Sequence, residues 1–325
     1  MTIGMIQLKM VETNKKIHLQ NMKNNNSLHS AKKEKNDEFY TQLEDIEKEC
    51  IHYAKHFKGK IVLCNCNDVL HKNFTLYFYR NFKTLGLKKL IATGYKVDGK
   101  HGKVCSYDGE EWTMRMLEGD GGYSTDECIE LLKESDIIVT NPPFSLFRNY
   151  VATLMKYDKK FLIIGNMNAI TYKEIFPLIK NDEMWLGVSR NGCGQMYFLI
   201  NEDMPEAKGQ IVVDGQKYQT IGSSAWFTNL DHNKRHEEIV LTKRYNEDEY
   251  QKYDNYDAID VSKVVNLPND YDGVMGVPIT FLGKYCPEQF QIIKFRKGDD
   301  NKDLSVNGKC PYFRILIKHK KCLVK

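Results

Sequence analysis

The tetrapeptide Asn141-Pro142-Pro143-Phe144 combines a carboxamide, two rigid imino acids and an aromatic ring. This set suits chemistry on the exocyclic amine of a nucleobase, which is a poor nucleophile because its lone pair is delocalised into the ring. The Asn141 side-chain carbonyl and a main-chain carbonyl held by the two prolines can accept from its two N–H groups and help it to pyramidalise. Phe144 can stack on a base that has left a duplex. Asn-Pro also closes ordinary turns, so the placement of the tetrapeptide decides its meaning.

The elements around the tetrapeptide alternate between strand and helix. Apolar runs predict strands at 60–65, 89–93, 136–140, 161–165 and 184–188. A helical pattern at 45–57 precedes the first strand, and further helical patterns follow the first four strands at 74–82, 128–133, 146–157 and 172–180. Ser124 and Glu127 form a capping-box pattern ahead of the third helix. The alternation predicts βαβ units and a parallel sheet covered on both faces, with ligands bound at the carboxyl ends of the strands.

Unusual residues stand at those expected carboxyl ends. The first strand ends in Asn65-Cys66-Asn67-Asp68 and the second in Thr93-Gly94-Tyr95. A loop of Gly119-Asp120-Gly121-Gly122 precedes the capped helix, and the strand at 136–140 ends in Asn141. Because these ends meet at one edge of the sheet, the tetrapeptide occupies the place where a catalytic group is expected.

Composition describes an ordinary folded protein. The 325 residues are 42% hydrophobic and 28% charged, which excludes wholesale disorder. No run approaches the roughly 20 apolar residues of a membrane span, and the start has no signal-peptide pattern, so we expect a cytoplasmic protein. Nine cysteines are an odd number and favour reduced thiols. Cys64-Asn65-Cys66 is the only close pair, and we expect no metal site.

Charge is concentrated at the two ends. Residues 1–35 carry net +5 and residues 284–325 net +7, within a chain of net +4. Basic ends suit contact with a polyanion such as nucleic acid, although they also fit a merely solvated surface. After Val188 the pattern changes to short period-2 segments, which predict a smaller, mixed and β-rich second region.

Several longer segments together resemble one family. The stretches 37–41, 60–68 and 136–147 closely resemble EcoRI-type adenine-specific DNA methyltransferases of restriction-modification systems. The likeness continues through 253–259, 273–282 and 310–318 and covers nearly everything from about Met22 onward. It implies a Rossmann-like S-adenosylmethionine-dependent methyltransferase sheet with a smaller mixed, β-rich target-recognition region.

The resemblance also implies a division of the chain and an activity. Residues 1–30 would be a disordered basic arm, 31–231 the catalytic core and 232–325 the target-recognition region, to which 189–224 can contribute. The enzyme would act as a monomer on double-stranded DNA and methylate N6 of a flipped adenine, the inner one of GAATTC. This modification would protect DNA from a cognate restriction endonuclease.

Site residues follow from the resemblance position by position. The catalytic residues would be Asn141, Pro142, Pro143 and Phe144. The S-adenosylmethionine ligands would be Phe39, Tyr40, Thr41, Asn65, Asn67, Asp68, Tyr95 and Asp120. Two departures stand out: the usual glycine-rich cofactor loop is replaced by Cys-Asn-Cys-Asn-Asp, and the second strand lacks the acidic residue that normally binds the ribose. Thr93 or Tyr95 would substitute for it only in part.

Nucleic-acid contacts carry no local signature in this sequence. The side-chain types and the basic ends favour Lys32, Lys33, Lys35, Arg190, Lys234, Arg235 and Arg296. Purely structural roles also remain open for two of the cofactor candidates, since Tyr40 can pack on the sheet and Asp120 can make an Asx turn. Two other functions also remain open, namely a methyltransferase acting on RNA or protein glutamine, and a catalytically silent DNA-binding protein with this fold.

Overall fold

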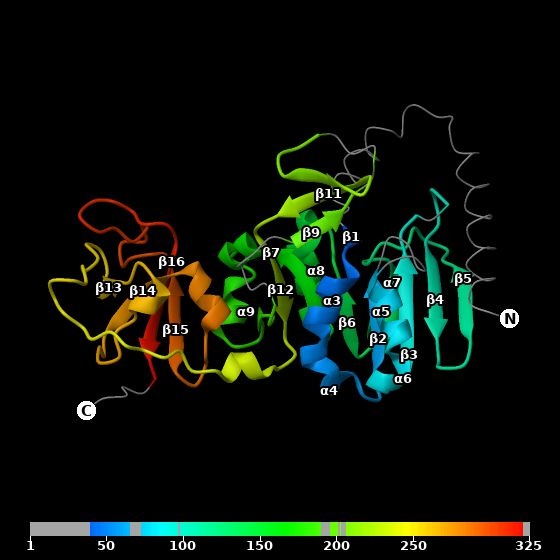
Figure 1. Ribbon diagram of the computed structural model, residues 1–325, viewed down its shortest axis with the longest axis horizontal. Helices are drawn as coiled ribbons and strands as arrows, with labels where there is room; N and C mark the ends of the chain where they lie inside the picture. Colours follow the sequence, from blue (N-terminus) through cyan, green and yellow to red (C-terminus); the bar gives the residue numbers. More distant parts are fainter. Residues whose placement is uncertain are drawn as a thin grey trace.

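An eight-stranded sheet forms the centre of the molecule (Figure 1). The computed structural model describes residues 40–65, 73–96, 98–189, 196–200, 202 and 206–320. The strand order is β5-β4-β3-β2-β6-β7-β12-β8. The strands are β2 (Ile61–Asn65), β3 (Lys89–Gly94), β4 (Lys103–Tyr107), β5 (Trp112–Met116), β6 (Ile137–Thr140), β7 (Lys160–Asn166), β8 (Trp185–Leu186) and β12 (Ser224–Thr228). The four neighbours β3, β2, β6 and β7 are parallel.

Helices cover both faces of this sheet, as the alternation predicts. One face carries α3 (Leu43–Cys50), α4 (Ala54–Phe57), α5 (Asn73–Arg80) and α6 (Phe82–Leu85), and the other carries α7 (Asp126–Glu134), α8 (Phe147–Lys156) and α9 (Phe176–Lys180). Strand β2 shows why both faces are filled: Val62 and Cys64 enter the first core, and Leu63 enters the second. The predicted Rossmann-like α/β fold is confirmed.

Two smaller sheets complete the fold. One has the order β1-β9-β11-β10, from β1 (Tyr40–Thr41), β9 (Met196–Leu199), β10 (Gln210–Val213) and β11 (Gln216–Ile221). The other has the order β13-β14-β16-β15, from β13 (Ala258–Asp260), β14 (Val274–Pro278), β15 (Phe290–Phe295) and β16 (Arg314–His319). The Phe176 and Phe295 rings lie 5.1 Å apart, so α9 and the C-terminal sheet share one hydrophobic core.

The strand predicted at 184–188 is not parallel to its neighbours. Only β8 forms there, and it pairs antiparallel with β12, which itself pairs antiparallel with β7. All five residues of β12 are buried, so this strand takes the interior position and β8 takes the edge. The helix predicted at 172–180 is also shorter than expected. It begins only at Phe176, because Pro177 lacks a backbone N–H and is tolerated only in the first turn of a helix.

The cap of α7 also differs from its prediction. Thr125, not Ser124, is the N-cap residue, and its hydroxyl accepts from Cys128 N at 3.4 Å. Glu127 does not close a capping box. Its carboxylate accepts from the backbone N–H groups of Glu118 and Gly119 instead, and so ties the start of the helix to the glycine-rich loop that precedes it.

Candidate active site

The Asn141 tetrapeptide lies directly after β6, at the carboxyl edge of the parallel strands. Asn141 Nδ2 donates to Thr41 Oγ1 at 3.2 Å. Thr41 is part of β1, which pairs with β9 in the small sheet. Asn73 Nδ2 in turn donates to Thr41 O at 2.7 Å. Asn141 Oδ1 is buried. The carboxamide is held through its Nδ2 by Thr41, which is 100 positions away in the sequence.

The two prolines fix the backbone that follows. Pro143 is extended (φ −52°, ψ 132°), and its carbonyl accepts from Leu146 N at 2.9 Å, where the 3₁₀ turn Phe144–Leu146 begins. Pro142 is buried, and no described backbone N–H donates to its carbonyl oxygen, in contrast to that of Pro143. Phe144 is only partly buried and packs against the hydrophobic core beside α3 and α5.

Asn65 ends the neighbouring strand β2 and is held by two hydroxyl groups. Tyr150 Oη donates to Asn65 Oδ1 at 3.0 Å, and Thr140 Oγ1 donates to Asn65 O. The Tyr150 ring meets the Tyr123 ring edge to face, with centroids 5.0 Å apart. Asn65 and the Asn141 segment are therefore joined at the strand ends, as their positions predict.

Asp120 and Tyr95 also come together at this edge. Lys96 N donates to Asp120 O at 2.8 Å, directly after Tyr95. The Asp120 carboxylate makes an Asx turn, with Oδ1 accepting from Gly122 N at 2.9 Å, and no described group donates to Oδ2. Thr93 is 2% exposed whereas Tyr95 is partly exposed, so of this pair Tyr95 offers its side chain at the edge.

Two glycines allow the Asp120 loop to lie against the end of β3. Gly121 has φ +79°, and a Cβ built there would lie 2.6 Å from Gly94 O. A Cβ on Gly102 would lie 2.4 Å from Gly121 Cα. Because contacts under 3.0 Å force a shift of backbone, this close approach requires glycine at both positions.

Part of the predicted site lies outside the described residues. Phe39, Asn67, Asp68, Lys32, Lys33, Lys35 and Arg190 all fall there. Within the described ranges, no group of three or more His, Cys, Asp and Glu side chains is arranged to hold a metal ion. In the same part of the chain, no helix is long and apolar enough to cross a membrane.

Lys234 and Arg235 lie in a polar network around the short 3₁₀ helix Asn233–His236, which follows β12. Arg235 donates to Asp182 Oδ1 at 2.8 Å, stacks 4.0 Å from the Trp185 ring, and has a side chain only 12% exposed. Lys234 Nζ donates to Val188 O at 2.9 Å. Both side chains therefore bind other parts of the same chain, and their predicted contact with DNA stays a prediction.

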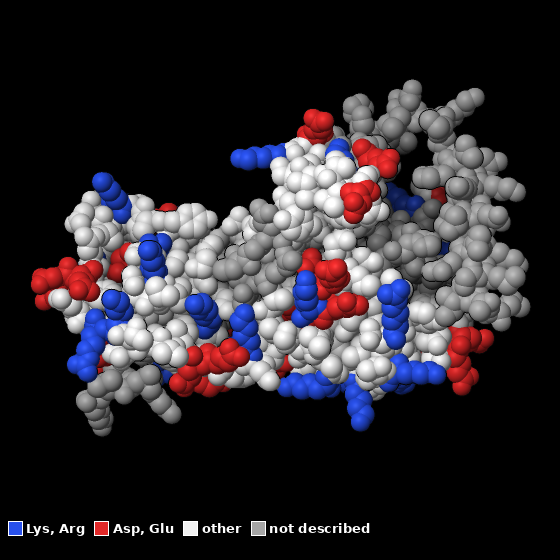
Figure 2. Space-filling model, in the orientation of Figure 1, with Lys and Arg blue, Asp and Glu red and all other residues white. Residues whose placement is uncertain are grey.

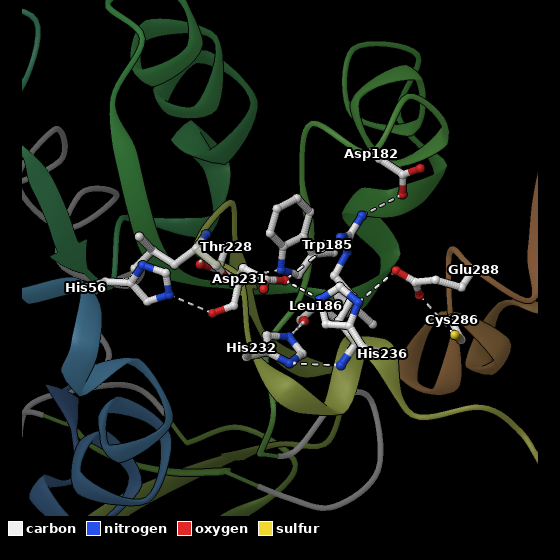
Figure 3. A network of polar contacts seen from close by, with 12 residues as sticks. His56, Asp182, Trp185, Leu186, Thr228, Asp231, His232, His236, Cys286 and Glu288 are labelled. Atoms are coloured by element: carbon white, nitrogen blue, oxygen red, sulfur yellow. Dashed lines mark hydrogen bonds and ion pairs between the residues drawn. The ribbon is translucent and has the colours of Figure 1, made fainter.

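His236 bridges two carboxylates in the same network (Figure 3). Its ring nitrogens lie 2.7 Å from Asp231 Oδ1 and 2.8 Å from Glu288 Oε1, and these hydrogen bonds raise the pKa of His236. Burial has the opposite effect on His232, whose pKa is lowered. The network therefore links the segment after β12 to the residues just before β15.

Arg296 is likewise engaged within the protein. Its guanidinium binds both carboxylate oxygens of Asp303 and stacks 4.2 Å from the Phe313 ring. In Figure 2, lysine and arginine side chains gather along the edge near α4 and α6, which is at the amino ends of the parallel strands. The basic charge gathered there thus lies away from the carboxyl ends of the strands.

Comparison with known proteins decides the family. Residues 27–320 match the family model described as "Adenine-specific methyltransferase EcoRI". The chain belongs to this family. It is 51% identical over 318 residues to the Type II methyltransferase M.EcoRI of Escherichia coli. This alignment covers 91% of this chain and 97% of the relative.

Two Mycoplasma proteins are more distant relatives. The Type II methyltransferases M.MpnI of Mycoplasma pneumoniae and M.MgeORF184P of Mycoplasma genitalium are each 39% identical, over 90% and 89% of this chain and 98% and 97% of the relatives. The same kind of search among solved structures returned no match. The family resemblance read from the sequence is confirmed, and the chain is an enzyme.

For this adenine-specific methyltransferase, the structure adds three residues that sequence reasoning missed. Thr140 and Tyr150 bind Asn65. Arg148 is exposed one helical turn beyond Phe144, and its guanidinium lies 5.1 Å from the centre of the Tyr172 ring. Arg148 has a sequence signal, because a cation closely follows the tetrapeptide. The roles of Thr140 and Tyr150 have none, since the hydrogen bonds depend on strands and helices packing side by side.

Proposed function

We propose that this enzyme transfers the methyl group of S-adenosylmethionine to N6 of the inner adenine in duplex GAATTC, and so protects DNA from a cognate restriction endonuclease. The observation that carries the proposal is the Asn141 carboxamide held by Thr41 at the carboxyl end of β6. The recognition sequence rests on the 51% identity with M.EcoRI. Such an enzyme would act as a monomer in the cytoplasm, on DNA.

The target amine would be bound by two acceptors from the tetrapeptide. Because Asn141 Nδ2 donates to Thr41, the carbonyl Oδ1 occupies the other branch of the carboxamide. Pro142 O is the second acceptor, since Pro143 O already binds Leu146 N. Two acceptors on the two N–H groups favour the pyramidal amine that attacks in line. Phe144 would stack on the adenine after it leaves the duplex.

The residues at the neighbouring strand ends fit S-adenosylmethionine, which supplies an electrophilic methyl group on a sulfonium centre. Asp120 Oδ2 offers an acceptor for an adenine amino group, and Tyr95 lies beside it at the end of β3. Asn65 offers a polar side chain at the end of β2, and Thr41, which follows Tyr40 in β1, binds Asn141. We infer that these residues hold the cofactor, together with Phe39, Asn67 and Asp68.

DNA would approach the same edge. Arg148 is exposed there and suits a phosphate contact, because guanidinium groups bind phosphate oxygens strongly. Arg190 and the lysines at 32, 33 and 35 remain further proposals for DNA contact. The C-terminal sheet and residues 189–224 would contribute target recognition.

Transfer of labelled methyl tests the proposal. S-adenosylmethionine would be incubated with a GAATTC duplex or a scrambled hexamer, using wild type, Asn141→Ala and the control Asn149→Ala. Asn149 is an exposed residue of α8, so its loss should leave labelling unchanged. Labelling of GAATTC alone, abolished only by Asn141→Ala, is the expected result. Labelling confined to RNA or protein would refute DNA as the acceptor, and absence of both cofactor binding and labelling would refute the activity.

A further inference from the structure

Asn65 is held at the carboxyl end of β2 through both its backbone and its side chain. Its backbone pairs with Thr93 of β3, its carbonyl accepts from Thr140, and its Oδ1 accepts from Tyr150 at 3.0 Å. Thr140 and Tyr150 lie on either side of the Asn141 tetrapeptide. The segment that binds the target amine therefore also fixes the end of β2.

Tyr150 is itself immobilised by its surroundings. It is 3% exposed and belongs to the hydrophobic core on the α7–α9 face of the sheet. The Tyr123 ring contacts it edge to face at 72°, a favoured aromatic geometry. A hydroxyl on such a fixed ring sets the orientation of the group that it binds.

The direction of the Tyr150 hydrogen bond determines what Asn65 can offer to a ligand. A carboxamide has one acceptor branch and one branch with two donors. Since Oδ1 accepts from Tyr150, the donor branch Nδ2 is turned away from Tyr150, and none of the described residues accepts from it. Asn65 is only partly buried and ends β2 at the carboxyl edge of the sheet, which is where a ligand would meet these donors.

A hydrogen-bond donor at this edge has a clear use. The sequence has no glycine-rich loop after β2 whose backbone N–H groups could bind an anion. Asp120, which also lies at this edge, supplies an acidic acceptor and would repel a carboxylate. A carboxylate on the cofactor needs a hydrogen-bond donor, and Asn65 Nδ2 provides one.

We propose that Tyr150 is a positioning residue that turns Asn65 so that its N–H groups bind the carboxylate of S-adenosylmethionine. The inference rests on the proposed function and assigns one part of its cofactor site. Tyr150 acts through Asn65 and touches neither the methyl group nor the target base.

Binding of two ligands by the intact enzyme tests the proposal. S-Adenosylhomocysteine carries the carboxylate, whereas 5′-methylthioadenosine lacks the whole amino-acid part. In Tyr150→Phe, titration calorimetry should show about tenfold weaker binding of S-adenosylhomocysteine, as expected for a disturbed hydrogen bond to a charged group, and unchanged binding of methylthioadenosine. The KM for S-adenosylmethionine should rise while kcat stays the same. Tyr157→Phe, at the end of the same helix, is the matched control and should change neither affinity.

A second pair of variants keeps the test decisive if Tyr150→Phe folds poorly. Asn65→Asp still accepts from Tyr150 but replaces the donors with a negative charge, so it should bind S-adenosylhomocysteine more weakly than Asn65→Ala does. Equal or tighter binding by Asn65→Asp, or an equal loss of both ligands in Tyr150→Phe, would overturn the proposal. If the wild type binds the cofactor and methylates DNA, either result refutes this inference alone. A wild type that binds neither ligand refutes the proposed function as well.

Discussion

Replacing Thr41 with valine should impair catalysis without unfolding the protein. The side chain is 5% exposed and its hydroxyl accepts from Asn141 Nδ2 at 3.2 Å. Valine has nearly the same shape, so packing between β1 and β9 is retained while the acceptor is removed. The Asn141 carboxamide then loses the contact that holds it at the end of β6.

The size of the effect follows from the burial of this hydrogen bond. Removing one partner of a buried pair costs about 1–3 kcal/mol. If that energy no longer holds Asn141 in its productive orientation, kcat falls by about 5- to 150-fold. Thr41→Ser keeps the hydroxyl and should retain most of the activity, since it loses only a methyl group.

Single-turnover methylation at saturating cofactor and DNA measures this effect directly. Fluorescence of 2-aminopurine at the target position would report base flipping, which should be unchanged in Thr41→Val. The reasoning is refuted if Thr41→Val turns over like wild type, or if Thr41→Ser is as slow as Thr41→Val.

Three further predictions concern the loop, the base and the junction. Gly102→Ala should lower the free energy of unfolding by about 1–3 kcal/mol in denaturant titrations, because its Cβ would lie 2.4 Å from neighbouring backbone. Gly119→Ala should be tolerated, because the nearest atom to its Cβ lies at 3.7 Å. Equal stabilities of the two variants would count against the close approach of the loop to β3. Phe144→Ala should reduce kcat/KM by about tenfold or more through lost base stacking, and an unaltered value would exclude stacking. The two carboxylates beside His236 raise its pKa above 6.5, so their stabilisation is complete below pH 6.5 and is lost as the pH rises through the raised pKa. His236→Asn should therefore flatten the pH dependence of thermal stability in that window, and a profile identical to wild type would contradict this.

The order of core strands and helices was predictable because it depends on local apolar patterns. Val62, Leu63 and Cys64 are consecutive, and their alternation between two cores is visible in the sequence. The position of Asn141 was predictable for the same reason, since the prolines end the strand before it. The insertion of β12 beside β7 was not, because the pairing of Trp226 with Ile164 joins segments far apart in the chain.

The contacts within the site show the same limit. Asn65, Asp120 and Asn141 could be placed at one edge from strand ends alone. That Thr41 would bind Asn141 depends on the pairing of β1 with β9, which leaves no local signal. Similarly, the sequence around Arg235 does not indicate that its guanidinium binds Asp182 and stacks on Trp185 of β8.

The most direct test of the central claim is to compare Asn141→Ala with Asn141→Asp and measure N6-methyldeoxyadenosine by mass spectrometry of digested GAATTC duplex. Aspartate keeps an acceptor for the amine and can accept from the Thr41 hydroxyl, whereas alanine keeps neither. We expect measurable N6-methyldeoxyadenosine with Asn141→Asp and a loss of at least about a hundredfold with Asn141→Ala. Equal activity of the two variants, or methylation by Asn141→Ala at the wild-type rate, would contradict the role of Asn141 as the acceptor that activates the amine.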